Sequence, residues 1–314
     1  MPNPTSVSEV VAVTPRRPVR RNRFTAYLFV APAAIYLLVL MAYPLFEGLR
    51  LSFTDTNLLN PRGGEYVGTE NYSELFSDPA FWRTLRITLI YTIVSVVGAI
   101  GVGLLAALGM NRLTGRSRLL RGLVIIPWAA PMIPVALISA WIFDNQYGVL
   151  NWFVTKVGIS DGYVQWLDNE HTALPSILAV TIWRVFPFSA VILLAALQGV
   201  SADLYEAARI DGTSRMNVFK HITLPAIRPT LGVLTLFVTI WSLRRFDLIW
   251  VLTEGGPLGS TNTLVIDLYK TAFRNSHLGL GSAIGVVGFA ISTSVTAVYF
   301  LLAARRARAT GANA

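Results

Sequence analysis

The chain has 314 residues, of which 54% are apolar and only 14% are charged, and it contains no cysteine. Soluble domains carry about 25% charged residues, so this chain has too few to cover a water-exposed surface, and the lack of cysteine excludes disulfides, thiolate metal sites and a cysteine nucleophile. A net charge of +9 would suit nucleic acid as a partner, but the basic residues lie beside apolar segments rather than in one patch.

Six long apolar segments follow one another along the chain. Four contain no charged residue, whereas the fourth in chain order contains only Arg184 and the fifth contains Arg244, Arg245 and Asp247. A helix needs about 20 apolar residues to cross the hydrocarbon core of a membrane. We therefore predict an all-α integral membrane protein with six transmembrane helices, at residues 24–46, 87–110, 122–143, 172–200, 229–253 and 278–304.

Lysine and arginine are concentrated in alternate connecting segments. Sixteen lie in the N-terminal tail, in the loops after the second and fourth apolar segments, and at the C-terminus, whereas seven lie in the other loops. Basic residues mark the cytoplasmic side of a membrane protein, so both termini are expected in the cytoplasm, and the positive charge indicates orientation rather than nucleic-acid binding. Residues 1–23, with several prolines and small polar residues, predict a disordered tail, and residues 306–314 predict a second cytoplasmic tail.

Loop 201–228, between the fourth and fifth apolar segments, predicts two short helices set at an angle. Asp203 followed by Glu206 is a helix-start signal, Gly212 supplies a left-handed residue that ends a helix, and Ser214 can cap a second helix. Pro225 is expected to stop that second helix. From the residues alone, this helix pair could lie on lipid, pack on its own bundle or bind a soluble partner.

The spacing of this loop resembles the EAA loop of ATP-binding-cassette (ABC) importer permeases. Glu206-Ala207-Ala208 is followed by Gly212 and then by Leu224-Pro225, and smaller motifs occur in matching order over residues 24–305. The variant here is similar to the carbohydrate branch, the maltose-type group. The resemblance implies the type I importer permease fold over 24–305 and an ATPase-coupling role for these loop residues: Glu206, Ala207, Ala208, Asp211, Gly212, Phe219, Leu224 and Pro225.

The resemblance also implies partners. It implies a second homologous permease that completes the pore, two copies of an ATPase subunit that bind ATP and Mg²⁺, an extracytoplasmic substrate-binding (lipo)protein, and a sugar cargo, with trehalose favoured. None of the three lysines of this chain follows a glycine, so the phosphate-binding Gly-Lys-Ser/Thr motif is absent. We therefore expect a non-enzymatic subunit of the bacterial inner membrane, surrounded by lipid, with no catalytic residue, no metal and no cofactor of its own.

Charged residues inside membrane spans are expensive and mark a transport pathway or an internal ion pair. Aromatic faces and planar charged groups also bind sugars. The candidate substrate pathway therefore comprises Trp183, Arg184, Phe186, Trp241, Arg244, Arg245 and Asp247. An internal Arg–Asp pair with interfacial aromatic anchors is the alternative, and three arginines would suit an anion at least as well as a neutral sugar.

Other functions stay open at this point. Within the family, the cargo could be a glycerol phosphate or another oligosaccharide. Outside it, a stand-alone secondary transporter would need ion-coupling groups near mid-membrane and usually an internal repeat, which we do not find. A membrane-embedded enzyme would need a base with a nucleophile or a set of metal ligands inside the spans, and the spans hold neither.

Overall fold

A computed structural model describes residues 23–112, 117–160 and 162–309, so most of each predicted tail lies outside the described residues. The regular structure of the described part is helical. Its helices are α1 (Arg23–Leu51), α2 (Glu70–Ser77), α3 (Pro79–Asn111), α4 (Ser117–Ala129), α5 (Met132–Ile142), α6 (Val149–Lys156), α7 (Ala173–Gln198), α8 (Ala202–Ile210), α9 (Arg215–Val218), η1 (Phe219–Thr223), α10 (Leu224–Leu243), α11 (Asp247–Thr253), α12 (Leu264–Tyr269), η2 (Lys270–Arg274) and α13 (Leu278–Ala309).

Five helices of the described chain are long and apolar enough to cross a membrane, and a sharply bent pair raises the number to six. The five are Tyr27–Leu51, Pro79–Asn111, Ala173–Gln198, Arg215–Leu243 and Leu278–Arg305. The all-α membrane fold predicted from the sequence is thus confirmed. The chain divides into two compact units after Glu47, so most of α1 forms a unit separate from the rest.

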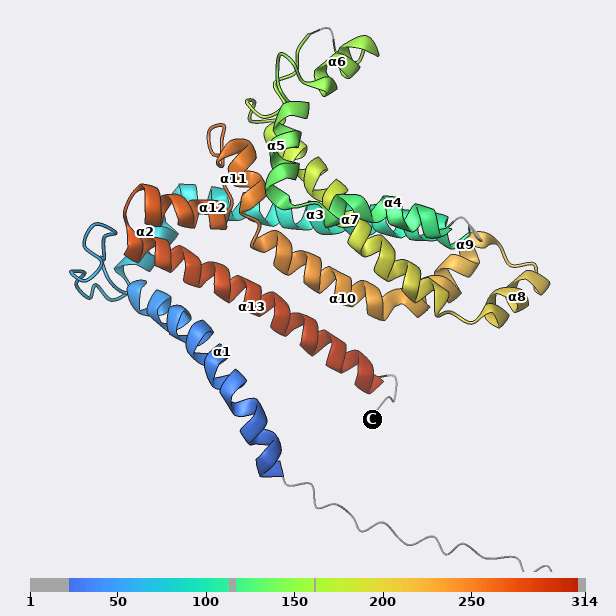
Figure 1. The fold of residues 1–314 in the computed structure, drawn as a ribbon, viewed down its shortest axis with the longest axis horizontal. Helices are drawn as coiled ribbons and strands as arrows, with labels where there is room; N and C mark the ends of the chain where they lie inside the picture. Colours follow the sequence, from blue (N-terminus) through green and yellow to red (C-terminus); the bar gives the residue numbers. More distant parts are fainter. Residues whose placement is uncertain (1–22, 113–116, 161, 310–314) are drawn as a thin grey trace, which may run out of the picture. The chain divides into compact units, whose positions relative to one another are not determined.

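The third predicted span, 122–143, is not one helix. α4 ends at Ala129, α5 begins at Met132, and the two helices meet at 94°. The cause is proline: Pro131 has no N–H to continue the hydrogen-bond ladder of α4, and Ala130 before it is driven out of the helical region. α5 therefore turns away from the line of α4 (Figure 1).

The fifth predicted span also differs from 229–253. Its helix, α10, ends at Leu243, and a new helix, α11, begins at Asp247. The three charged residues of this region therefore lie at a helix break or at the first turn after it, not within a continuous helix. The last predicted span is longer than expected, because α13 continues through the start of the predicted tail to Ala309.

The core of the second unit is the pair of long helices α3 and α7, which lie side by side (Figure 1). Small residues of α3 face α7, and a Cβ atom built on Gly103 would come within 2.6 Å of the Ser189 Cβ atom and 3.0 Å of the Ala190 amide nitrogen. Small residues allow such close packing where no hydrophobic effect drives helices together. Around this pair, α4 and α10 pack on α7, α11 packs on α5, and α12 packs on α13.

Gly103→Ala should lower the stability of the fold. The added methyl group meets backbone atoms of α7 that cannot move independently, and overpacking of this kind costs about 1–3 kcal/mol. The matched control is Gly101→Ala, because a Cβ atom at Gly101 meets nothing within 4 Å while the gain in helix propensity is the same. Thermal unfolding of the purified chain in detergent, followed by tryptophan fluorescence, should show a lower midpoint for Gly103→Ala only; equal midpoints would contradict the close α3–α7 contact.

Candidate functional site

The first helix of loop 201–228 has well-formed ends. It starts two residues earlier than expected, because its N-cap is Ser201 rather than Asp203. The Ser201 side chain accepts a hydrogen bond from the Asp203 amide at 3.3 Å. At its other end the Gly212 amide donates to the Arg209 carbonyl and the Thr213 amide to the Ala208 carbonyl, at 3.1 and 3.0 Å. This is a Schellman motif, which needs a left-handed residue, and Gly212 has φ of +66° as predicted.

The second helix of the loop runs into the membrane span without interruption. Ser214 caps α9 as predicted and accepts from the Asn217 amide at 3.4 Å. The expectation that Pro225 stops this helix is wrong: residues 215–243 form one helix, with a π-helical turn, Phe219–Thr223, just before the proline. The wider turn changes the hydrogen-bond register, and the Leu224 amide bonds to the Phe219 carbonyl, so the missing proline N–H and the ring are accommodated without a break.

α8 and the α9–η1 segment enclose a shallow pocket of about 420 Å³. The Tyr205 hydroxyl of α8 and the Thr223 hydroxyl of η1 lie 3.2 Å apart and tie the two segments together. The residues that line the pocket are Leu204, Ala207, Ala208, Asp211, Thr213, Asn217, Val218, His221 and Ile222.

The predicted coupling residues fall into two groups around this pocket. Ala207, Ala208 and Asp211 line the pocket. Gly212 forms the corner between α8 and α9, and Glu206 is exposed. Phe219 and Leu224 are half-buried in the helix that leads away from it, and Pro225 is exposed. Large apolar side chains also stay uncovered here, with Ile210 87% and Met216 61% exposed. Exposed apolar patches of this kind mark surfaces that bind another protein or a membrane.

A second polar site lies where the two broken helices come together. The Arg184 side chain of α7 donates from Nη2 to the carbonyl oxygen of Ala130 at 3.1 Å, between α4 and α5. In a membrane a backbone carbonyl released by a helix break needs a partner from the protein. Arg184, which the sequence analysis predicts to line a substrate pathway, supports the break in the third span.

The charged residues of the other break differ in their surroundings. Arg245 is half-buried and lies beside the Tyr91 hydroxyl, which is itself 2.9 Å from the Thr181 hydroxyl. Arg244 and Asp247 are exposed. Within the described residues no carboxylate oxygen lies within 4.0 Å of Arg184, Arg244 or Arg245, so the internal Arg–Asp pair considered above does not form.

The aromatic candidates do not form one lining. Trp241 packs against Phe188 with ring centroids 4.8 Å apart, and Phe188 stacks on Trp128 at 5.6 Å. Trp183 is 49% exposed on α7, and Phe186 packs on the apolar cluster between α3 and α7. The structure thus places Arg184 within electrostatic range of Arg245 but leaves the aromatic residues divided between cluster and surface.

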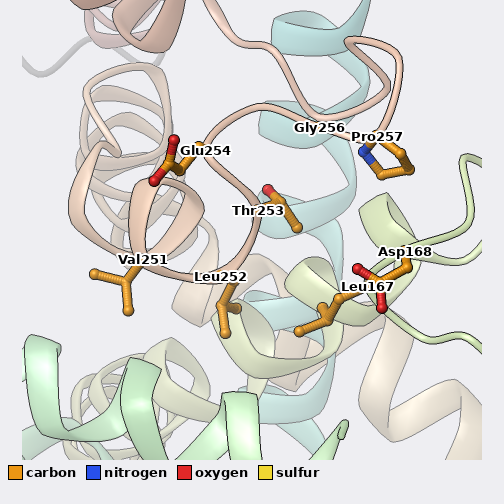
Figure 2. Close-up of a pocket in the computed structure, with 8 residues that line it drawn as sticks. All are labelled: Leu167, Asp168, Val251, Leu252, Thr253, Glu254, Gly256 and Pro257. Carbon is orange, nitrogen blue, oxygen red and sulfur yellow. The ribbon is translucent and has the colours of Figure 1, made fainter. Parts of the chain in front are cut away.

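A further pocket of about 360 Å³ lies between the segment that ends α11 and the residues before α7 (Figure 2). Glu254 and Asp168 line it with Thr253, Gly256 and other residues. The Glu254 carboxylate pairs with the Arg274 guanidinium at 2.8 Å, and that guanidinium lies 4.6 Å from the Trp250 ring centre. Nearby, Asn262 donates to Asp267 at 2.9 Å and to the Thr84 hydroxyl at 3.1 Å, and burial raises the pKa of the Asp267 carboxyl.

The sequence analysis did not identify two members of the polar site around Arg184 and Arg245, namely Tyr91 and Ala130. Tyr91 is an uncharged residue in a long apolar segment, and Ala130 acts through its backbone, so neither has a signal of its own. The three prolines at 127, 131 and 134 were the available signal for the break, because a proline inside a span ends or kinks its helix.

Comparisons with known proteins all point to one group. Residues 99–308 match the family of binding-protein-dependent transport system inner membrane components. The chain is 38% identical to the sulfoquinovosyl glycerol transport system permease protein SmoG of Agrobacterium fabrum, over 88% of this chain and 90% of that one. It is 37% identical to the trehalose/maltose transport system permease protein MalF of Thermococcus litoralis, over 89% and 93%.

A solved structure shares the fold. It belongs to a bacterial ABC transporter involved in the import of the acidic polysaccharide alginate, with a TM-score of 0.78 and 22% identity over 90% of this chain and 96% of that one. A second structure of an alginate transporter, in complex with a periplasmic protein bound to an alginate pentasaccharide, has a TM-score of 0.76.

Arg184→Met should destabilise the region around the α4–α5 break. Methionine fills a similar volume but cannot donate to the Ala130 carbonyl, and an unsatisfied buried acceptor costs about 1–3 kcal/mol. Arg184→Gln retains a donor and should lose less. The thermal unfolding midpoint of the purified chain in detergent tests this order; a midpoint for Arg184→Met equal to that of the unsubstituted chain would show that the hydrogen bond does not support the break.

Proposed function

The chain belongs to the family of binding-protein-dependent transport system inner membrane components, and from this premise we propose that loop 201–228 couples it to a separate ATPase subunit. The chain is a multi-pass inner-membrane protein, the permease subunit of an ABC sugar importer. The observation that carries the coupling proposal is the exposed pocket of loop 201–228, joined to a membrane span by one unbroken helix.

The partner that fits this surface is a soluble protein with an apolar projection and a cationic group. The small side chains of Ala207 and Ala208 in the pocket lining allow a partner to approach α8 closely. Glu206 beside it is exposed and offers a carboxylate to a lysine or arginine of the partner. Since α9, η1 and α10 form one continuous helix, movement of the docked partner would pass directly into the membrane span.

The rest of the assembly follows the same proposal. A second permease of this kind would complete the pore, two ATPase copies would bind ATP and Mg²⁺, and an extracytoplasmic binding protein would deliver the cargo. With the ATPase on loop 201–228, both termini would be cytoplasmic, as the basic residues indicate. Transport would occur by alternating access, with the loaded binding protein and ATP favouring the outward-facing state.

We propose a glycoside of about disaccharide size as the cargo. Supporting this, the names of similar permeases specify trehalose and maltose, sulfoquinovosyl glycerol, and diacetylchitobiose for a Streptomyces coelicolor protein at 33% identity. Trehalose, favoured by the sequence motifs, is the neutral candidate. The unpaired Arg184 and Arg245 give a specific reason to consider a second candidate, a glycoside or glycerol derivative that bears an acidic group.

Gly212→Val should uncouple the permease from its ATPase. A β-branched residue resists a φ of +66°, so the corner between α8 and α9 would distort. Gly158→Val is a matched control, because Gly158 also has positive φ (+74°) and neither glycine has an atom within 4 Å of a built Cβ. ATP-dependent uptake and co-purification of the ATPase should fall at least tenfold for Gly212→Val while membrane insertion is unchanged. Loss in both variants, or in neither, would contradict the coupling role.

Glu206→Lys tests the charge of the docking surface separately from its shape. The side chain is exposed on α8, so the helix should persist while a lysine repels the cationic group of the partner. ATPase co-purification should weaken, and the weakening should be greatest at low ionic strength. Glu74→Lys, at an exposed position of α2, should have no effect; equal retention of the ATPase by both variants would exclude Glu206 from the contact.

A further inference from the structure

We propose that the cargo of this transporter carries an acidic group, a carboxylate, sulfonate or phosphate, and that Arg184 and Arg245 bind it. This inference rests on the proposed function and adds the charge of the substrate to it. It selects the second of the two cargo candidates named above over a neutral disaccharide.

The two arginines lie at a depth where a charge needs compensation. Arg184 is roughly 17 Å along α7 from Ala173, at 1.5 Å per residue, in a helix about 39 Å long. It is within electrostatic range of Arg245 and Asp247, so the α10–α11 break reaches a similar level. Discontinuous helices at mid-membrane depth line substrate cavities in transporters, because irregular backbone is tolerated there only where protein or a polar cavity surrounds it.

The positive charge of this site is not balanced by the chain itself. Two half-buried arginines, Arg184 and Arg245, have one carboxylate in range, Asp247, and no ion pair joins them in the part of the chain that the structure describes. An unpaired guanidinium in a low-dielectric interior costs far more than one that binds an anion. The site therefore favours a ligand that brings negative charge.

Hydrogen-bond donors at the site are also free. The Nε atoms of Arg184 and Arg245 are both buried without a hydrogen-bond partner. Arg184 uses Nη2 on the Ala130 carbonyl, which holds its guanidinium in place while Nε stays available. Beside Arg245 lie the Tyr91 and Thr181 hydroxyls. Planar guanidinium groups with neighbouring hydroxyls suit the several acceptor oxygens of an oxyanion.

Neutral hydroxyl groups would satisfy some of these donors but not the charge. A sugar hydroxyl can accept hydrogen bonds but brings no negative charge to the two arginines, whereas a carboxylate, sulfonate or phosphate supplies both acceptors and charge. Hydrogen bonds to charged groups are about twice as strong as neutral ones. The charge balance and the free donors thus agree on an acidic ligand.

The test compares two ligands that differ in one group. The complete transporter, purified with its second permease and ATPase subunits but without the binding protein, is placed in lipid nanodiscs at constant ionic strength. Methyl β-D-glucuronide and methyl β-D-glucoside, which differ by a carboxylate in place of a hydroxymethyl group, are each titrated while tryptophan fluorescence is followed. The glucuronide should bind about tenfold more tightly or better.

Substitutions then assign the preference to the site. Arg245→Gln should bring the two affinities to parity, Arg245→Lys should retain most of the preference, and Arg62→Gln, in an exposed loop, should leave it unchanged. Equal affinities for the two ligands in the unsubstituted transporter would overturn the proposal, and so would a preference that survives Arg245→Gln combined with Arg184→Gln.

One alternative has its own signature. If a carboxylate of the second permease pairs with these arginines, the glutamine variants should lose that subunit on purification, and the unsubstituted complex should show no preference for glucuronide; this result would also overturn the proposal. Failure of the proposed function is recognised separately, since the ATPase would then not co-purify with the unsubstituted chain. A complex that assembles and imports a neutral glycoside without preferring the acid would refute only the acidic cargo.

Discussion

The interior of this protein depends on one constraint: a backbone group freed by a helix break inside a membrane needs a partner from the protein. Two spans of the chain are broken, after Ala129 and after Leu243, and the first break is supported by the hydrogen bond from Arg184 to the Ala130 carbonyl. That bond sets the position of the guanidinium. It also joins α7 to the chain between α4 and α5, and α11 packs on α5.

The breaks also explain why charged residues are tolerated in an apolar bundle. In a continuous helix over 229–253, Arg244 and Asp247 would share one face and Arg245 would point to another. At the break, Arg245 lies half-buried beside Tyr91, whereas Arg244 and Asp247 are exposed. A polar site is thereby assembled next to the tightly packed α3–α7 pair, whose small residues leave little freedom for rearrangement.

The chain accommodates two of its prolines in opposite ways. At Pro131 the chain breaks and turns by 94°, whereas at Pro225 a π-helical turn absorbs the proline and the helix continues. Loop 201–228 is therefore connected to α10 by a stiff element rather than a hinge. Such a connection suits a device that transmits force from a surface pocket into a membrane span, while the break at Pro131 suits a region that lines a cavity.

The sequence by itself determined the class and the local chemistry. Apolar length predicted the helices, because every spanning backbone needs internal hydrogen bonds, and the residues of loop 201–228 predicted the left-handed Gly212 and the Ser214 cap, because these depend on near neighbours. It could not show whether Pro131 and Pro225 break or bend their helices, since that depends on the hydrogen-bond partners and the turn that the rest of the fold provides. Only the tertiary structure decided that Arg184 bonds to a carbonyl, that Arg245 lies beside Tyr91 and that neither pairs with a carboxylate. The reason is that these contacts join residues more than 50 positions apart, such as Arg184 and Ala130.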